Sequence, residues 1–79
     1  MKTVLITGAN RGLGLEFAKQ YADSNWEVIA TCRKKSDLEA TKRLGDNVSI
    51  FEMDVTNFEE CKSIREVLKG QTIDVLINN

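Results

Sequence analysis

The sequence predicts an α/β fold, in which a parallel sheet is built from strands joined by helices. Short, β-branched apolar runs alternate with segments whose apolar residues recur every three or four positions. Glycines and Ser/Thr-x-x-Glu patterns stand where helices should end or begin. Such alternation favours right-handed crossovers between parallel strands. We expect the strand order 3-2-1-4, which is part of a doubly wound sheet with helices on both faces.

The first strand and the first helix are predicted from the opening 23 residues. Residues Thr3–Thr7 form a short apolar run, which indicates a buried strand. Between Gly12 and Asp23, large apolar residues lie four positions apart and therefore share one face of a helix. These residues are Leu13, Phe17 and Tyr21.

The second unit is a strand followed by a short helix. Residues Trp26–Thr31 are apolar and β-branched, as expected of a strand. Ser36 followed by Glu39 fits a capping box, in which both side chains satisfy backbone N–H groups at a helix start. We expect this helix to reach about Leu44 and to end at Gly45.

Two further strands are predicted at Val48–Met53 and Ile73–Ile77. A second capping box at Thr56 predicts a helix between them, which runs to about Lys69 and ends at Gly70. Its apolar face is expected to lie on the opposite side of the sheet from the first two helices. That face consists of Phe58, Cys61, Ile64 and Leu68.

The turn between the first strand and the first helix is rich in glycine. Gly8, Gly12 and Gly14 give the spacing G-x-x-x-G-x-G, and no Gly-Lys-Ser/Thr follows, so this is not a P-loop. Backbone N–H groups at a helix N-terminus carry partial positive charge, and glycines let a diphosphate approach them. A glycine-rich turn with a purely structural role is the alternative. Its place between a strand and a helix favours dinucleotide binding.

Residues Thr7–Gly14, TGANRGLG, resemble the TGxxxGxG cofactor motif of the short-chain dehydrogenase/reductases, which have a Rossmann-type fold. Asn78-Asn79 is similar to the start of the NNAG motif of that family, and Asp54-Val55 is similar to its acidic position after the third strand. Within the family, the chain resembles small reductases related to the bacterial C-factor and to insect sniffer-type carbonyl reductases. The resemblance implies that residues 1–79 are the N-terminal part of a dinucleotide-binding domain, about the front third of such an enzyme.

The end of the second strand indicates which cofactor is preferred. An acidic side chain there would bind the adenosine ribose of NAD(H) and repel the 2′-phosphate of NADP(H). This chain has the neutral Cys32 instead, followed by Arg33, whose guanidinium can pair with phosphate. Arg11 resembles the second basic residue of NADP-preferring members. The alternative is that Arg33, with Lys34 and Lys35, is a solvated charged turn; we expect NADP(H).

The resemblance implies further cofactor-binding positions. It implies that Asn10 braces the glycine turn and that the backbone N–H of Leu13 meets the diphosphate. Asp54 would hold the adenine amino group, Val55 would line the adenine pocket, and Asn78 would tie the fourth strand to the ribose. Asp54 has a structural alternative as a helix cap, and Asn78 has one as a polar strand end.

The family's catalysis needs a serine and a Tyr-x-x-x-Lys pair. The only tyrosine is Tyr21, and Asn25 stands where the lysine would be, so we expect no catalytic residues in this chain. We expect the cofactor-binding portion of a reductase whose full length transfers hydride between nicotinamide and a carbonyl or alcohol substrate. The alternative is a non-catalytic nucleotide-binding or interaction module.

Composition limits the other possibilities. A chain of 79 residues forms at most one domain, and a net charge of −1 does not indicate nucleic acid or an anionic membrane as partner. We expect no signal peptide, and no apolar run in the sequence is long enough to span a membrane. The spacing of Cys32 and Cys61 suggests neither a metal site nor a disulfide, so a cytoplasmic location is expected. The open edge at the fourth strand predicts a homo-oligomer.

Overall fold

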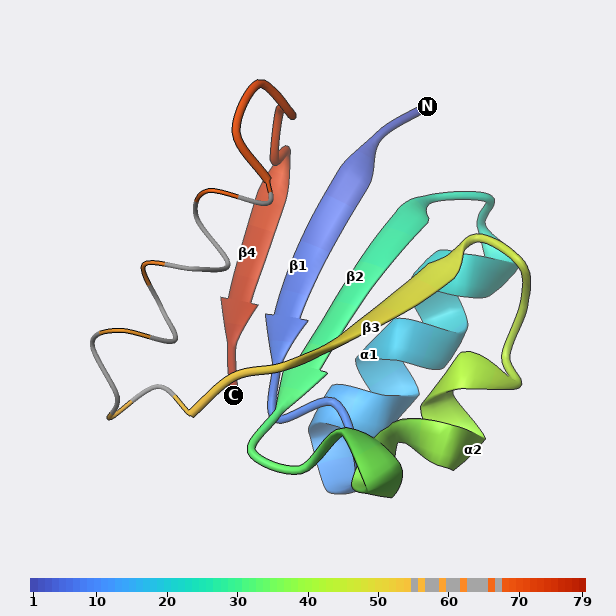
Figure 1. The fold of residues 1–79 in the computed structure, drawn as a ribbon. Helices are drawn as coiled ribbons and strands as arrows, with labels where there is room; N and C mark the ends of the chain where they lie inside the picture. Colours follow the sequence, from blue (N-terminus) through green and yellow to red (C-terminus); the bar gives the residue numbers. More distant parts are fainter. Residues whose placement is uncertain (55, 57–58, 60–61, 63–65, 67) are drawn as a thin grey trace.

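The computed structural model describes residues 1–54, 56, 59, 62, 66 and 68–79. Figure 1 shows a single sheet with helices packed on it. In chain order, the described elements are β1 (Thr3–Thr7), α1 (Gly12–Asp23), β2 (Glu27–Cys32), the 3₁₀ turn η1 (Lys35–Leu38), α2 (Glu39–Lys42), β3 (Val48–Glu52) and β4 (Val75–Asn78).

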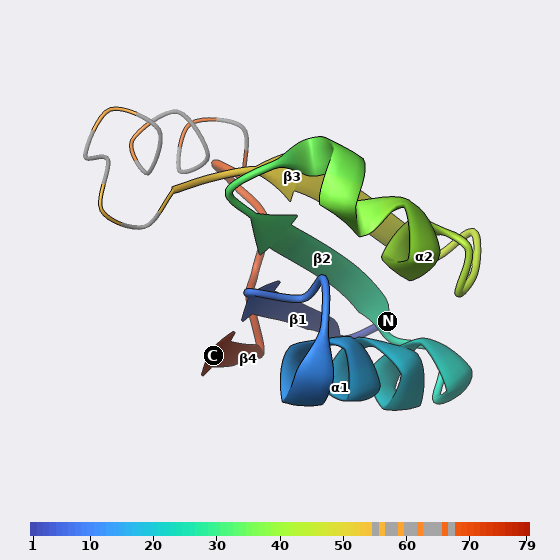
Figure 2. The same cartoon turned by 90° about the horizontal axis from the view of Figure 1, so that it is seen from below.

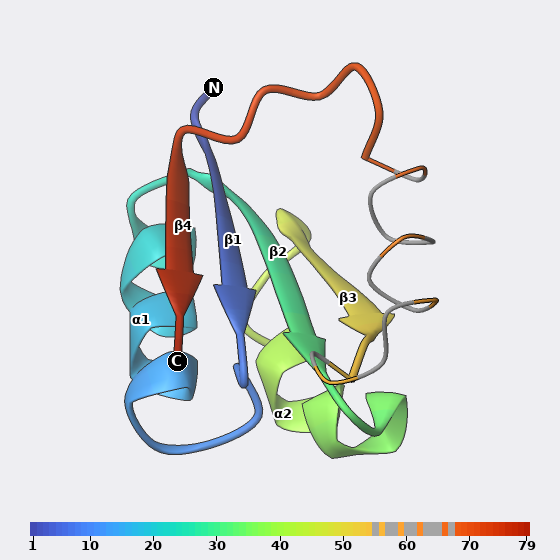
Figure 3. The same ribbon diagram turned by 90° about the vertical axis from the view of Figure 1, so that its left-hand side faces the viewer.

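The strands form one parallel sheet in the order β3-β2-β1-β4, which confirms the predicted order. Thr7, the last residue of β1, pairs with Thr31 of β2 on one side and with Asn78 of β4 on the other. All the arrowheads in Figure 3 therefore point to the same end of the sheet. Polar residues at these strand ends are brought together there, although they are far apart in the sequence.

Helices α1 and α2 lie on the same face of the sheet, as Figure 2 shows. Between them and the strands is a core of small and β-branched side chains. Ala18 and Ala22 of α1 are buried, and their small size allows the helix to approach the sheet closely. The helix predicted for the opposite face, between Thr56 and Lys69, lies largely outside the described residues. The core residues on the described face include Val4, Ile6, Val28, Ala30 and Leu38.

The second helix differs from the prediction. Lys34 has the extended backbone of an N-cap, and the chain then enters η1, so that Ser36 lies inside the first turn rather than before it. Neither η1 nor α2 has a side-chain cap, and the capping box predicted at Ser36 is wrong. The helix also ends at Lys42, short of Gly45, because the Leu44 N–H turns back to the carbonyl of Thr41 at 3.1 Å.

Strand boundaries are shifted by one or two residues from the prediction. β2 begins at Glu27 and includes Cys32, and β3 ends at Glu52. β4 begins at Val75, because Asp74 closes the end of the sheet by two hydrogen bonds with Thr3. The Asp74 N–H donates to the Thr3 carbonyl at 2.9 Å, and the Thr3 N–H donates to the Asp74 carboxylate at 2.8 Å. Within the part of the chain that the structure describes, no helix has the length and apolar character needed to cross a membrane.

Candidate functional site

A pocket of about 640 Å³ opens at the carboxyl ends of β1 and β2. Parallel α/β sheets bind ligands at the carboxyl edge of the sheet, beside the point where the strand order reverses, which is between β1 and β4 in this chain. Its walls come from the glycine turn, the end of β2, η1, the segment after β3 and the chain end after β4. The lining residues are Thr7, Gly8, Asn10, Arg11, Thr31, Cys32, Arg33, Asp37, Met53 and Asn79.

The glycine turn has the conformation that requires glycine at two positions. Gly8 and Gly12 have φ angles of 62° and 56°, in the left-handed region that side chains disfavour. A Cβ at Gly12 would meet nothing within 4 Å, so the turn is open on that side. A Cβ at Gly14 would overlap the carbonyl oxygen of Gly8, so only glycine lets α1 pack this closely against the turn.

Helix α1 begins without a side-chain cap, because its N-cap residue is Arg11, whose backbone is extended. The helix also has no acidic residue in its first turn. The partial positive charge of its N-terminal N–H groups is therefore not offset by a carboxylate of that turn. An anion at this end of α1 would be favoured by the same N–H groups.

Two residues that the sequence analysis did not assign hold the glycine turn in place. The buried Thr41 hydroxyl donates to the Ala9 carbonyl at 2.8 Å, and the Ala9 N–H donates to the Thr31 carbonyl at 3.0 Å. From the other side, the Asn79 side-chain amide donates to the Gly8 carbonyl at 3.0 Å. Asn79 was noticed only as half of an Asn-Asn pair, and no spacing in the sequence links Thr41 to the turn.

Asn10 has different surroundings from those that the resemblance implied, and Leu13 differs from the helix face predicted for it. Asn10 lines the pocket, but among the described residues no hydrogen bond of its side chain is found. The bracing of the turn comes from Thr41 and Asn79 instead. Leu13 is 68% exposed, so it does not belong to the apolar face predicted for α1, whose buried side chains are Ala18 and Ala22 instead. The expected contact of its backbone N–H with a diphosphate stays a prediction.

Asn78 lies at the same edge, but it does not line the pocket. Its side-chain oxygen accepts a hydrogen bond from the Thr7 hydroxyl at 3.0 Å, and that hydroxyl accepts one from the Asn79 N–H at 3.1 Å. These bonds fasten the end of β4 to the end of β1. The observed contacts of Asn78 are thus those of a polar strand end.

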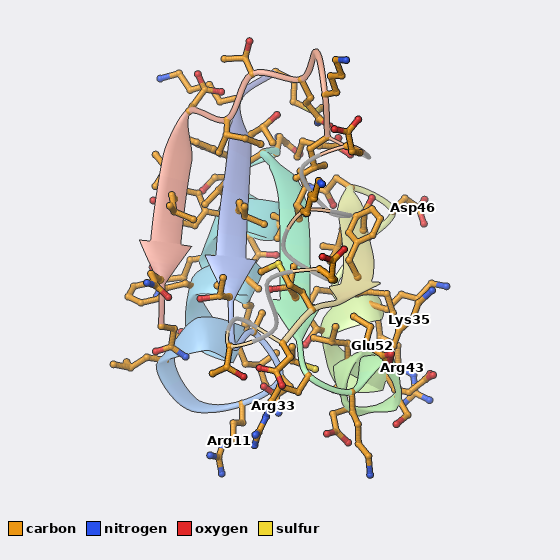
Figure 4. All side chains as sticks on the ribbon, turned by 60° about the vertical axis from the view of Figure 1, so that its left-hand side comes forward. Arg11, Arg33, Lys35, Arg43, Asp46 and Glu52 are labelled. Atoms are coloured by element: carbon orange, nitrogen blue, oxygen red, sulfur yellow. The ribbon has the colours of Figure 1, made fainter. Side chains whose placement is uncertain are left out.

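The basic side of the pocket is formed by Arg11, from the glycine turn, and Arg33, which follows β2. Both are exposed, and Figure 4 shows them at the same end of the sheet, one beside the other. Cys32, the last residue of β2, precedes Arg33 and is only 6% exposed, and its thiol donates to the Lys34 carbonyl at 2.8 Å. Burial raises the pKa of the Cys32 thiol, and nearby carboxylates raise it further, so the residue presents no charge to the pocket at neutral pH.

Asp54 is held by its neighbour in the sequence. Thr56 donates to one Asp54 carboxylate oxygen from its hydroxyl at 2.6 Å and from its backbone N–H at 2.9 Å. These bonds, with a smaller contribution from Arg33, hold the pKa of Asp54 below its usual value. The helix that Asp54 would cap lies largely outside the described residues, so both roles expected for Asp54 stay predictions.

The structure thus brings some of the predicted site residues together and places others around them. The predicted residues that line the pocket are Gly8, Asn10, Arg11, Cys32 and Arg33. Those that lie outside its lining are Gly12, Leu13, Gly14, Asp54 and Asn78, and Val55 lies outside the described residues. Lining residues that the sequence analysis missed include Thr31, Asp37, Met53 and Asn79.

A parallel sheet in this order, with a glycine-rich turn at its carboxyl edge, is typical of dinucleotide-binding α/β proteins. The protein-family model for short chain dehydrogenases matches residues 2–79, so the chain belongs to this family of nicotinamide-dependent oxidoreductases.

Curated relatives support the assignment. The NADP-dependent 3-hydroxy acid dehydrogenase of Salmonella typhimurium is 39% identical over 96% of this chain. Retinol dehydrogenase 8 of Bos taurus is 37% identical over 99% of it. The chain spans only 32% and 28% of the lengths of these two relatives.

Solved structures share the fold. A short-chain dehydrogenase/reductase from Burkholderia multivorans with bound NADP matches 99% of this chain and 36% of its own, with a TM-score of 0.86 and 30% identity. The menthone neomenthol reductase of Mentha piperita matches 99% of this chain and 31% of its own, with a TM-score of 0.87 and 26% identity.

Proposed function

We propose that this chain is the NADP(H)-binding portion of a short-chain dehydrogenase/reductase that acts on a carbonyl or alcohol substrate. The observation that supports this most directly is that Arg11 and Arg33 line the same pocket. The neutral, buried Cys32 lies where an acidic residue would favour NAD(H). Guanidinium groups bind phosphate in two-pronged, charge-assisted hydrogen bonds. The named relatives that use or hold NADP point the same way.

The residues present fit a dinucleotide. The open side of Gly12 leaves room at the N-terminus of α1, where the helix N–H groups favour a diphosphate. Thr31, which lines the pocket, has a buried hydroxyl oxygen without a hydrogen-bond partner in the described part of the chain. Buried polar groups are rarely left unpaired in the functional state of a protein. The nicotinamide, when bound, would supply or accept the hydride.

The chain's own contribution is to bind and orient. The glycine turn would hold the diphosphate, with Gly8 fixed in place by Asn79. Arg33, at the end of β2, would pair with the 2′-phosphate and thereby select NADP(H). The catalytic serine and Tyr-x-x-x-Lys pair of the family would come from outside residues 1–79, which we propose form the N-terminal part of the dinucleotide-binding domain.

A cytoplasmic location belongs to the same proposal, and the free thiol of Cys32 is in keeping with a reducing compartment. The particular similarity of this chain to the C-factor and sniffer-type reductases within the family stays a prediction.

The cofactor preference is tested by removing its basic side chain. Arg33→Ala is expected to weaken NADPH binding by about 1–3 kcal/mol, roughly 5- to 150-fold, because a charge-assisted phosphate contact is lost. NADH binding should change little, and adding Cys32→Asp to that variant should turn the preference toward NADH. Calorimetric titration with both nucleotides measures these affinities.

The matched control is Arg43→Ala, which removes an exposed arginine outside the pocket lining. It should leave both affinities unchanged. Equal affinity of the unmutated chain for NADPH and NADH would contradict the NADP(H) assignment.

Association with a second copy is also proposed. Among the described residues, β4 pairs only with β1, and Leu76 at its centre is 63% exposed. The strand carries no proline or lysine that would discourage pairing with another chain. We expect light scattering to report a dimer at tens of micromolar, roughly where a weak specific dimer forms. Leu76→Lys should make it monomeric without loss of helical circular dichroism, whereas a clean monomer of the unmutated chain would contradict the proposal.

A further inference from the structure

Asp37 places a carboxylate in the wall of the pocket. The proposed function depends on the positive charges of Arg11 and Arg33 in the same wall. The last residue of β2 is the neutral Cys32, so the strand itself brings no acidic side chain to its carboxyl end. In the structure, η1 turns the chain back toward that strand end, so that Asp37 and Arg33 both line the same space. An acidic group therefore reaches the pocket from five residues further along the chain than Cys32.

The position of Asp37 is fixed by the turn that carries it. Its N–H donates to the Lys34 carbonyl at 2.9 Å, which closes the 3₁₀ turn. The next residue, Leu38, is fully buried in the core. Asp37 itself is exposed, so its side chain stands on an anchored turn at the mouth of the pocket.

Asp37 lines the same pocket as Cys32, at the end of β2. After burial, which is the largest cause, its carboxylate is one of the nearby charges that raise the pKa of the Cys32 thiol. The pocket therefore holds two basic groups, Arg11 and Arg33, and the acidic Asp37, and among the described residues no ion pair joins Asp37 to either arginine.

We propose that Asp37 is a specificity-determining residue, whose carboxylate opposes the 2′-phosphate that Arg33 attracts and so limits the preference for NADP(H). This inference rests on the proposed function. A phosphate monoester carries a charge of about −1.5 to −2 near neutral pH, so a carboxylate in the same pocket repels it. A ligand that has only the ribose hydroxyl at that position does not meet this repulsion.

The experiment compares two small probes, adenosine 2′,5′-bisphosphate and adenosine 5′-monophosphate, which differ only in the 2′-phosphate. Asp37→Asn should bind the bisphosphate about three- to tenfold more tightly than the unmutated chain, the range expected for an exposed charge pair. The affinity for the monophosphate should stay within about twofold of that of the unmutated chain, because its 2′-hydroxyl is uncharged. The gain should shrink in high salt, because salt screens exposed charges.

Asp46→Asn is the matched control, because it removes the same charge from an exposed residue outside the pocket lining. Figure 4 shows Asp46 at the opposite end of the sheet from Arg33. It should leave both probes unaffected. An equal gain in Asp46→Asn would assign the effect to net charge and overturn the inference, as would an unchanged bisphosphate affinity in Asp37→Asn. Weaker monophosphate binding in Asp37→Asn would also overturn it, by showing that Asp37 binds the ribose. Failure of the unmutated chain to bind either probe would instead overturn the proposed function, and the inference with it.

Discussion

Gly14→Ala is expected to lower the free energy of unfolding by about 3 kcal/mol, the upper end of the usual cost of overpacking, because the closest atom that the added Cβ meets belongs to the backbone and not to a flexible side chain. The added Cβ would overlap the carbonyl oxygen of Gly8 and lie 2.8 Å from the side-chain nitrogen of Asn79. Gly8 cannot easily move away, because its carbonyl is held by Asn79. The strain must therefore separate α1 from the turn that it follows.

The control for this variant is Gly12→Ala, two residues earlier in the same turn. A Cβ there has open space, so the only cost is the left-handed backbone, about 1–2 kcal/mol for a residue other than glycine. Urea denaturation followed by the fluorescence of Trp26, the single tryptophan, measures both variants. A loss in Gly14→Ala no greater than that in Gly12→Ala would show that the close packing at Gly14 is relieved at little cost.

The parts of the fold that were predicted correctly depend on local patterns. The bounds of β1 and α1 agree with the prediction, because an apolar β-branched run and a four-residue apolar spacing each report one element. The strand order was expected from the doubly wound pattern of such chains, and the nearly invariant handedness of crossovers places α1 and α2 on one face. The capping box at Ser36 failed because the same residues also fit a 3₁₀ turn, and the turn begins after Lys34, so that Ser36 lies within it.

Site residues were predicted only where a motif or a strand end pointed to them. Arg11 lies within the glycine motif and Arg33 follows the end of β2, and both line the pocket. Thr41 and Asp37 reach the site through the packing of η1 and α2 on the sheet, which no spacing in the sequence encodes. The sequence alone therefore could not predict that Asp37 lines the pocket, because this depends on where η1 packs.

Leu38→Ala is expected to destabilise the fold by about 2–5 kcal/mol, the usual cost of emptying a fully buried leucine site. Leu38 is 0% exposed and belongs to the core cluster between the helices and the sheet. It is also the side chain that anchors η1, which contacts β2 and β3. Its loss should therefore loosen the turn that carries Asp37, as well as lower the overall stability.

Two comparisons separate these effects of Leu38. Leu38→Met keeps the volume and should cost less than about 1.5 kcal/mol, with adenosine 2′,5′-bisphosphate binding unchanged. Leu44→Ala removes a half-buried leucine just beyond α2 and should cost less than Leu38→Ala, because less apolar surface is buried there.

Hydrogen exchange should show that amides of residues 35–38 lose protection in Leu38→Ala before those of β1 and β2 do. If η1 kept its full protection in that variant, the turn would owe its position to its backbone hydrogen bonds rather than to Leu38.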